Sequence, residues 1–215
     1  RNQGGGQATL ISQDSGIDNF FAGKIWQMAY DQGGKLVRKD PLPEMKGAQF
    51  YTLTLFDYAR DGKSEYLGLG EPGLDHSAPL EVWNQEGNRV TKLDEKLGGT
   101  NNYVRSGKKN PDDQPPANLV NGKIAVMDVD NDGKKEILVI ANNPLIGKVD
   151  FVLYYDGSIV ALKPEGSSLV QAYKSGKMKY CLTDLRVFGE TLYISAAEAE
   201  ITNLEEGAGR ILWYE

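Results

Sequence analysis

The sequence contains one cysteine, one histidine and no long hydrophobic run. A single cysteine, Cys181, cannot form a disulfide within the chain, so cysteine usage does not identify a cellular compartment. The alternating residues around Cys181 predict a strand and a buried, unreactive thiol. Without a cluster of cysteine and histidine, a zinc site has no support, and His76 is expected to be a loop residue rather than a member of a catalytic triad.

No apolar segment approaches the roughly 20 residues that a transmembrane helix needs, so we expect no direct membrane insertion. A signal peptide is not visible at the start of the sequence, which resembles neither a natural start nor a targeting segment. The chain has 24 basic and 30 acidic residues and a net charge of −6. This balance argues against nucleic acid and against anionic lipid as the main partner.

Helical periodicity is almost absent as well. Most apolar segments are short, rich in β-branched and aromatic residues, and bounded by glycine, aspartate, asparagine or proline. The 25 glycines agree with a fold that contains many tight turns. The sequence therefore predicts an all-β protein of many short antiparallel strands, which means a sandwich, a barrel or a propeller.

Internal repetition favours the propeller. The segment LFDYARDGKSEYLGLGE (55–71) aligns with VMDVDNDGKKEILVIAN (126–142), so that Asp57 and Asp128 are 71 residues apart. Each copy has a predicted strand, an aspartate, three residues, Asp-Gly-Lys, one residue, a glutamate and a second predicted strand. Self-similarity of this kind is typical of repeat architectures and is not needed by a sandwich.

A third, weaker copy, LTDLRVFGETLYISAAE (182–198), keeps Asp184 and Gly189 but not the other acidic residues. A second hairpin follows each of the first two copies, because LEVWNQEGNRVTKL (80–93) matches FVLYYDGSIVALK (151–163) around a glycine turn. The repeating unit is then four strands, two around an acidic loop and two around a glycine turn. Such units indicate the blades of a β-propeller.

We expect an incomplete set of about three to four blades from a larger propeller. The predicted units are a partial blade (1–40), a blade (48–93), an interblade loop (94–121), a blade (122–163) and a partial blade (178–215). So few blades cannot close a ring, and open blades leave edges uncovered, so the missing blades are expected on a cleaved segment or a second polypeptide. The alternative is a smaller compact fold in which the terminal strands pair with each other.

The loop DVDNDGKKE (128–136) has the ligand pattern of a calcium site. Alternating acidic residues can turn toward a common centre, Gly133 permits a sharp bend, and a final acidic residue closes the site. The predicted calcium ligands are Asp128, Asp130, Asp132, the carbonyl of Lys134, and Glu136. The spacing begins like an EF-hand, but the closing acid comes earlier and the flanks are strands. The alternative is a plain Asp-Gly turn with solvated carboxylates.

The other two copies are weaker candidates. In the first copy the predicted ligands are Asp57, Asp61, the carbonyl of Lys63, and Glu65. Ala59 replaces one carboxylate there, so the site is expected to be weak or empty. In the last copy Arg186 stands where an oxygen is needed, and no metal is expected.

These repeats resemble the integrin-like FG-GAP or VCBS family, whose blades carry an Asp-x-Asp-x-Asp-Gly-x-x-acid loop between two strands. The resemblance covers most of the chain through its repeats and is complete at residues 128–136. It implies a seven-bladed propeller located outside the cytoplasm, on a secreted, cell-surface or periplasmic protein. It also implies a structural calcium ion and a role in binding a protein or glycan.

No coherent catalytic set accompanies the loop, since calcium explains its paired carboxylates better than acid–base chemistry does. Trp26, Trp83 and Trp213 recur in corresponding predicted strands, which favours packing between blades over a sugar-binding platform. The leading hypothesis is a noncatalytic, calcium-stabilised module that presents loops to a protein or glycan. The alternative is the propeller part of a secreted or periplasmic carbohydrate-active hydrolase or lyase whose catalytic residues lie largely outside this chain.

Overall fold

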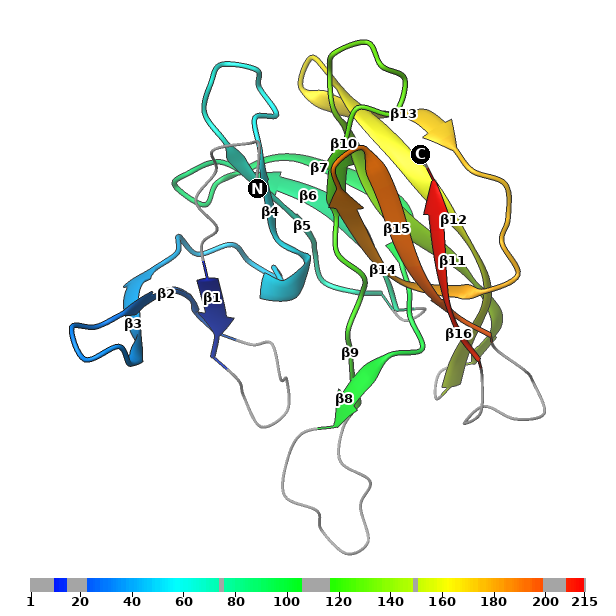
Figure 1. The fold of residues 1–215 in the computed structure, drawn as a ribbon, viewed down its shortest axis with the longest axis horizontal. Helices are drawn as coiled ribbons and strands as arrows, with labels where there is room; N and C mark the ends of the chain where they lie inside the picture. The colour runs from blue at the N-terminus through cyan, green and yellow to red at the C-terminus, as the bar shows by residue number, and fades with distance from the viewer. Residues whose placement is uncertain are drawn as a thin grey trace, which may run out of the picture.

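The protein is built from β-strands that form several separate sheets (Figure 1). The computed structural model describes residues 10–14, 23–73, 76–105, 117–148, 151–198 and 208–214. Within these ranges the one helix is a short 3-10 turn, η1 (Phe50–Thr52), and none of the sheets closes on itself. No helix in the described part of the chain is long and apolar enough to span a membrane. The predicted all-β class is confirmed.

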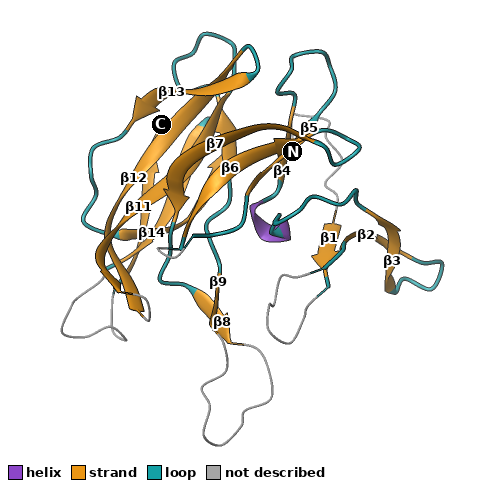
Figure 2. Ribbon diagram, turned by 180° about the vertical axis from the view of Figure 1, so that it is seen from behind, coloured by secondary structure: helices purple, strands orange, loops and turns teal. Residues whose placement is uncertain are grey.

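Four antiparallel meanders make up most of the fold (Figure 2). A single parallel pair, Gly98–Ala141, joins the second and third meanders, called sheets A and B here, into one eight-stranded sheet. The N-terminal sheet contains β1 (Leu10–Gln13), β2 (Ile25–Tyr30) and β3 (Leu36–Pro41). Sheet A contains β4 (Thr54–Phe56), β5 (Glu65–Leu69), β6 (Ser77–Trp83) and β7 (Arg89–Gly98). Sheet B contains β10 (Ala125–Met127), β11 (Glu136–Lys148), β12 (Phe151–Glu165) and β13 (Ser168–Lys174). The C-terminal sheet contains β14 (Cys181–Phe188), β15 (Thr191–Ala197) and β16 (Gly209–Tyr214).

Sheets A and B repeat the same strand pairing. In sheet A, β4 and β5 end on the pair Phe56–Glu65, and in sheet B, β10 and β11 end on the pair Met127–Glu136. Each pair lies at the base of one acidic loop. The two acidic loops therefore connect strand pairs with the same arrangement.

Both faces of sheet B are apolar, and both are covered. On β11, Ile137 and Val139 pack against sheet A, whereas Leu138 and Ile140 pack against the C-terminal sheet. An antiparallel sheet with one face in water would alternate apolar and polar residues instead. Strand β11 therefore requires a neighbouring sheet on each side.

Sheet A is covered on both faces too. Its second face carries Trp83, which is 2% exposed and packs with Ile25 of β2 and with Met45. The sheets consequently stack in a row, in the order N-terminal sheet, sheet A, sheet B, C-terminal sheet. The predicted role of tryptophan in packing between units is confirmed for Trp83, whereas Trp213 is exposed on the last sheet of the row.

A buried amide on β11, Asn142, ties three of these sheets together. Its Nδ2 donates to Gly99 O at 2.7 Å, directly after sheet A, and to Leu182 O of β14 at 2.8 Å. Its Oδ1 accepts a hydrogen bond from Leu182 N at 3.0 Å. Because Asn142 is buried, these bonds satisfy backbone groups that water cannot reach.

Strand β12 corrects the predicted hairpin at 151–163. The strand runs straight through Gly157, and the turn lies at Gly166, which has φ 61° and precedes β13. Glycine at position 157 instead allows the side chains of Asn142 and Leu182 to approach the backbone of β12, because a Cβ there would lie 2.1 Å from Asn142 Oδ1 and 2.8 Å from Leu182 Cγ. The unit predicted to end at residue 163 therefore extends through β13.

The segment 94–121, predicted as an interblade loop, is also partly regular. It begins inside β7, and it contains a two-stranded ladder of β8 (Tyr103–Arg105) and β9 (Ala117–Leu119). Residues 106–116 of that segment, and the segments 1–9 and 15–22 of the predicted first partial blade, lie outside the described residues. Within the described ranges β1 pairs with β2 and β16 with β15, so the terminal strands do not pair with each other.

Replacing Asn142 by alanine is expected to destabilise the protein by about 2–4 kcal/mol, because it removes the side-chain hydrogen bonds to the buried Gly99 O and to both backbone groups of Leu182. Urea denaturation followed by circular dichroism measures this change. Asn143→Ala is the matched control, since Asn143 is only half-buried and its side chain reaches Asp156 within the same sheet. Equal losses for the two variants would contradict the cross-linking role.

Candidate metal centre

The acidic loop of sheet B connects β10 to β11, and two residues with left-handed backbone shape it. Asn131 has φ 58° and Gly133 has φ 82°. Asparagine and glycine adopt this region more readily than other residues, so the chain can turn sharply here. Asp128 follows the end of β10 directly, and Glu136 is the first residue of β11. The turn therefore returns the far end of the loop to its start.

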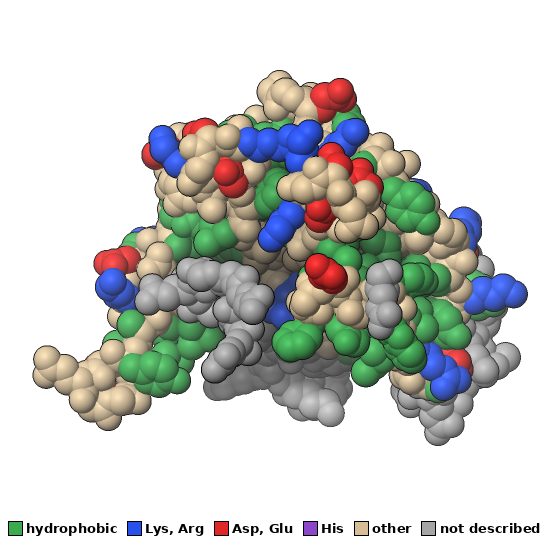
Figure 3. Space-filling view, turned by 45° about the horizontal axis from the view of Figure 1, so that its top comes forward, with side chains coloured by type: hydrophobic (Ala, Val, Ile, Leu, Met, Phe, Trp, Pro, Cys, Tyr) green, Lys and Arg blue, Asp and Glu red, His purple; other side chains and the backbone are tan. Residues whose placement is uncertain are grey.

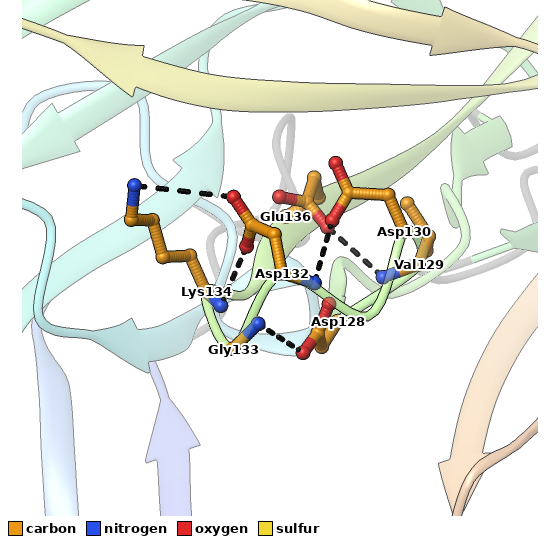
Figure 4. A network of polar contacts seen from close by, with 7 residues as sticks. All are labelled: Asp128, Val129, Asp130, Asp132, Gly133, Lys134 and Glu136. Carbon is orange, nitrogen blue, oxygen red and sulfur yellow. Dashed lines mark hydrogen bonds and ion pairs between the residues drawn. The ribbon is translucent and has the colours of Figure 1, made fainter.

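This turn brings three of the predicted calcium ligands together (Figure 4). Asp128, Asp130 and Glu136 each offer one carboxylate oxygen, and these oxygens lie within 4.8 Å of one another. Asp132 is not part of this group. Its Oδ1 accepts a hydrogen bond from Lys134 N at 2.7 Å, and its Oδ2 lies 3.9 Å from Lys134 Nζ. The geometry supports three carboxylate ligands and leaves Asp132 beside Lys134.

Backbone N–H groups hold the three carboxylates in place. Gly133 N donates to Asp128 Oδ2 at 2.9 Å, and Val129 N donates to Glu136 Oε2 at 2.9 Å. Asp132 N donates to Asp130 Oδ1 at 3.1 Å. The carboxylates are thus oriented by the loop backbone before any ion binds.

One atom in the loop, Asp128 Oδ1, has no hydrogen-bond partner among the described residues although it is buried. A buried carboxylate oxygen without a partner is costly, and native proteins rarely keep one. In a plain Asp-Gly turn the carboxylates would be solvated instead. A cation beside Asp128 Oδ1 would remove this cost, so the atom favours a metal site over an ordinary turn.

Burial and crowding of negative charge both act on Glu136. Burial raises the pKa of its carboxyl group above the ordinary glutamate value, and the hydrogen bond from Val129 N partly opposes this. The neighbouring Asp130, Asp132 and Asp128 raise the pKa further. A bound divalent cation would reverse the effect of this charge, because it favours the ionised carboxylates.

The donor set suits a hard cation. Calcium takes about six to eight oxygen ligands, and three carboxylates can supply several of them, with backbone carbonyls or water completing the shell. The loop contains no histidine or cysteine, the ligands that zinc and copper prefer. An ion held by Asp128, Asp130 and Glu136 would fasten the end of β10 to the start of β11, which is a structural role.

The loop of sheet A has the same backbone shape. Arg60 and Gly62 have φ 57° and 87°, matching the two left-handed residues of the loop in sheet B. Gly62 N donates to Asp57 Oδ2 at 3.0 Å, and Tyr58 N donates to Glu65 Oε2 at 2.8 Å. These bonds are equivalent to those that orient Asp128 and Glu136.

At the positions of the predicted ligands the two loops differ by one side chain. Ala59 occupies the position of Asp130, so Asp57 and Glu65 lack the third carboxylate. Asp61 Oδ1 accepts a hydrogen bond from Lys63 N at 2.9 Å and repeats the arrangement of its counterpart in sheet B. The loop of sheet A therefore has the scaffold of the site with an incomplete ligand set.

The third sequence copy is not a loop. Asp184 lies within β14, and the turn falls at Gly189, which has φ 65°. Asp184 Oδ1 accepts a hydrogen bond from Lys123 N at 2.8 Å, and its Oδ2 lies 3.2 Å from Arg186 Nε. This aspartate joins the C-terminal sheet to the segment that precedes β10.

Two residues considered for chemistry from the sequence have other roles. Cys181 is buried, as predicted, and burial raises the pKa of its thiol to about 11. The thiol therefore stays protonated near neutral pH and is a poor nucleophile. His76 lies in the turn before β6, where its backbone N–H donates a hydrogen bond to Gly73 O at 2.9 Å.

The structure also contains a polar cleft that the sequence did not point to. It has a volume of about 770 Å³ and lies beside sheet A, lined in part by Glu44, Lys46, Glu71, Glu81, Arg89 and Lys92. Glu81 is buried, and its Oε1 lies 3.4 Å from Arg89 Nη1. The residues come from separate segments and carry both charges, so no local sequence pattern could reveal the cleft.

The metal-free protein is expected to lose stability as pH rises through the titration of Glu136. Its pKa is raised in the folded state, so the folded protein binds this proton more tightly than the unfolded chain does. That contribution is complete at low pH and is lost between the unfolded and the folded pKa. Glu136→Gln should remove this part of the pH dependence in urea titrations with a chelator, and parallel profiles for the two proteins would contradict the assignment.

Comparison with known proteins does not assign this site. A scan against models of known protein families finds no match to the chain, and a search of curated proteins finds none either. The interpretation of the loop therefore depends on its own contacts, and above all on Asp128 and Glu136.

Proposed function

We propose that the chain is a noncatalytic binding module, built of calcium-stabilised β-propeller blades, that presents loops to a protein or glycan outside the cytoplasm. The observation that carries this proposal is the convergence of Asp128, Asp130 and Glu136, together with a buried oxygen of Asp128 that has no partner in the described structure. The stacked four-stranded meanders support the propeller assignment, because blades pack face to face in this way. Further blades, from another chain or another segment, would complete the ring.

The proposed location follows from the strength expected of the site. Three carboxylates on a short loop resemble the modest sites of extracellular modules, which bind calcium with dissociation constants of about 10⁻⁴–10⁻³ M. Calcium is abundant enough to fill such sites outside the cytoplasm. There the ion would stabilise the turn between β10 and β11 permanently rather than act as a signal.

The loops that would contact a partner lie away from the acidic loops. In Figures 1 and 2 the two acidic loops lie at one end of the stacked sheets, and the β8–β9 ladder projects from the opposite end. This ladder exposes Tyr103 and Val104. Figure 3 turns the acidic-loop end toward the viewer and shows acidic and basic side chains interspersed over it. We therefore assign metal binding to one end and partner binding to the other.

Calcium at about ten times its dissociation constant should stabilise the protein by about 1.4 kcal/mol, which is roughly 3–6 °C in melting temperature for a chain of this size. Asp128→Asn should abolish this gain, since it weakens the ligand with the unpartnered oxygen. Scanning calorimetry with calcium and with EDTA measures the effect. The proposal fails if EDTA leaves the melting temperature of the wild-type protein unchanged.

Ala59→Asp is the matched gain-of-function variant. It adds to sheet A the carboxylate that Asp130 supplies in sheet B, on a loop with equivalent hydrogen bonds. Calcium titration by calorimetry should then show a second site per chain, or a tighter first-loop site if one already binds weakly. An unaltered titration would show that the matching backbone of the two loops is not enough to bind calcium.

A panel of polysaccharides separates binding from catalysis. We expect the protein to be retained by an immobilised glycan or protein without releasing new reducing ends, because the described residues contain no coherent catalytic set. Tyr103→Ser should weaken retention if the β8–β9 ladder contacts the partner. Release of new reducing ends from any glycan would overturn the noncatalytic assignment.

A further inference from the structure

The two end sheets of the row each present an open apolar face. We call the face of a sheet that points to the next sheet in the row its front, and the face that points to the preceding sheet its back. The front of the C-terminal sheet exposes Phe188, Tyr193, Ile211 and Trp213. The back of the N-terminal sheet exposes Leu10 and Tyr30.

The front of the C-terminal sheet corresponds to buried positions in sheets A and B. In sheet A the second and third strands pair Leu67 with Val82 on the front, and both residues are 0% exposed. Leu67 lies two residues beyond Glu65, the residue that pairs with the end of the first strand. In sheet B the same rule gives the pair Leu138–Ala161, which is also buried.

Packing identifies the corresponding face of the C-terminal sheet, and this face is uncovered. Leu192 and Ile194 pack against sheet B, so Tyr193, which lies between them, points to the front, where it pairs with Trp213. Tyr193 is 38% exposed and Trp213 is 64% exposed. Ile211, two residues from Trp213 on the same strand, is 67% exposed. The front faces of sheets A and B are each covered by the next sheet. Within the described structure, no sheet covers the front of the C-terminal sheet.

The back of the N-terminal sheet can be compared with the back of sheet A through two equivalent turns, one after β2 and one after β6. Asp31 Oδ1 accepts hydrogen bonds from the N–H groups two and four residues ahead, and Asn84 Oδ1 does the same in sheet A. This equivalence places Tyr30 at the position of Trp83. Trp83 is 2% exposed and is covered by the N-terminal sheet, whereas Tyr30 is 73% exposed.

We infer that the front of the C-terminal sheet docks on the back of the N-terminal sheet of a second copy of this chain. Every contact between stacked sheets inside the chain joins a front to a back, and the described chain leaves one open face of each kind. A second copy supplies the complement to both faces, and two such contacts close a pair around a twofold axis. The inference rests on the blade-stacking part of the proposed function and is independent of calcium.

The first test compares single variants. The wild-type protein should form dimers, or short head-to-tail oligomers, that dissociate on dilution in analytical ultracentrifugation. Trp213→Glu and Tyr30→Glu should each weaken association by at least about tenfold, as expected for an aromatic side chain at the centre of an interface. Val90→Glu is the control, because Val90 is exposed on sheet A and belongs to neither open face. Circular dichroism verifies that all variants are folded.

The second test mixes the two deficient variants. In a head-to-tail pair of Trp213→Glu with Tyr30→Glu, one contact carries both changes and the other carries none. Mixing should therefore restore part of the association that each variant alone has lost. A dimer formed through two identical front faces would behave differently, since Tyr30→Glu would leave it intact and mixing would restore nothing.

Two results would overturn the inference. One is a wild-type protein that stays monomeric at concentrations up to about 0.1 mM, where even a weak interface is detected. The other is an association that Tyr30→Glu does not affect. Neither result bears on the calcium site, which the melting experiment with Asp128→Asn tests separately, so failure of this inference and failure of the calcium proposal are distinguishable.

Discussion

The fold depends on the apolar character of both faces of sheets A and B. On β11 consecutive residues alternate between the two sides, with Ile137 and Val139 toward sheet A and Leu138 and Ile140 toward the C-terminal sheet. A sheet of this kind cannot leave either face in water at low cost, because burying a single leucine or isoleucine side chain contributes about 1.5–3 kcal/mol. Stacking in a row satisfies the constraint, and Asn142 supplies the polar link that sets how three of the sheets meet.

Stacking also explains where the other features lie. The faces of the sheets pack against neighbouring sheets, so the loops at the ends of the strands are available for other roles. The acidic loops of sheets A and B lie at the same end because both connect the first strand to the second in the same register. A cation at Asp128 would therefore stabilise the connection between two strands without disturbing the contacts between sheets. The loss of one carboxylate at Ala59 leaves the shape of the loop unchanged, which agrees with a stabilising role that a unit can lack.

The sequence alone predicted the all-β class, the two equivalent acidic loops and the burial of Cys181, because each has a local pattern. It failed where a residue acts through distant partners. Gly157 resembles a turn glycine, yet it lies within a strand because Asn142 and Leu182 approach it closely. Asp184, where no metal was expected, accepts a hydrogen bond from Lys123 N, a contact that no local pattern indicates. The polar cleft beside sheet A is assembled from segments that share no pattern.

We propose that a calcium ion holds the 128–136 loop, which is then not a solvated turn. A crystal structure of the protein grown with calcium, with anomalous diffraction data, distinguishes these two states. We expect one strong anomalous peak among the carboxylates of Asp128, Asp130 and Glu136, in contact with Asp128 Oδ1. A structure in which Asp128 Oδ1 accepts a hydrogen bond from water and no peak lies among the three carboxylates would contradict the proposal.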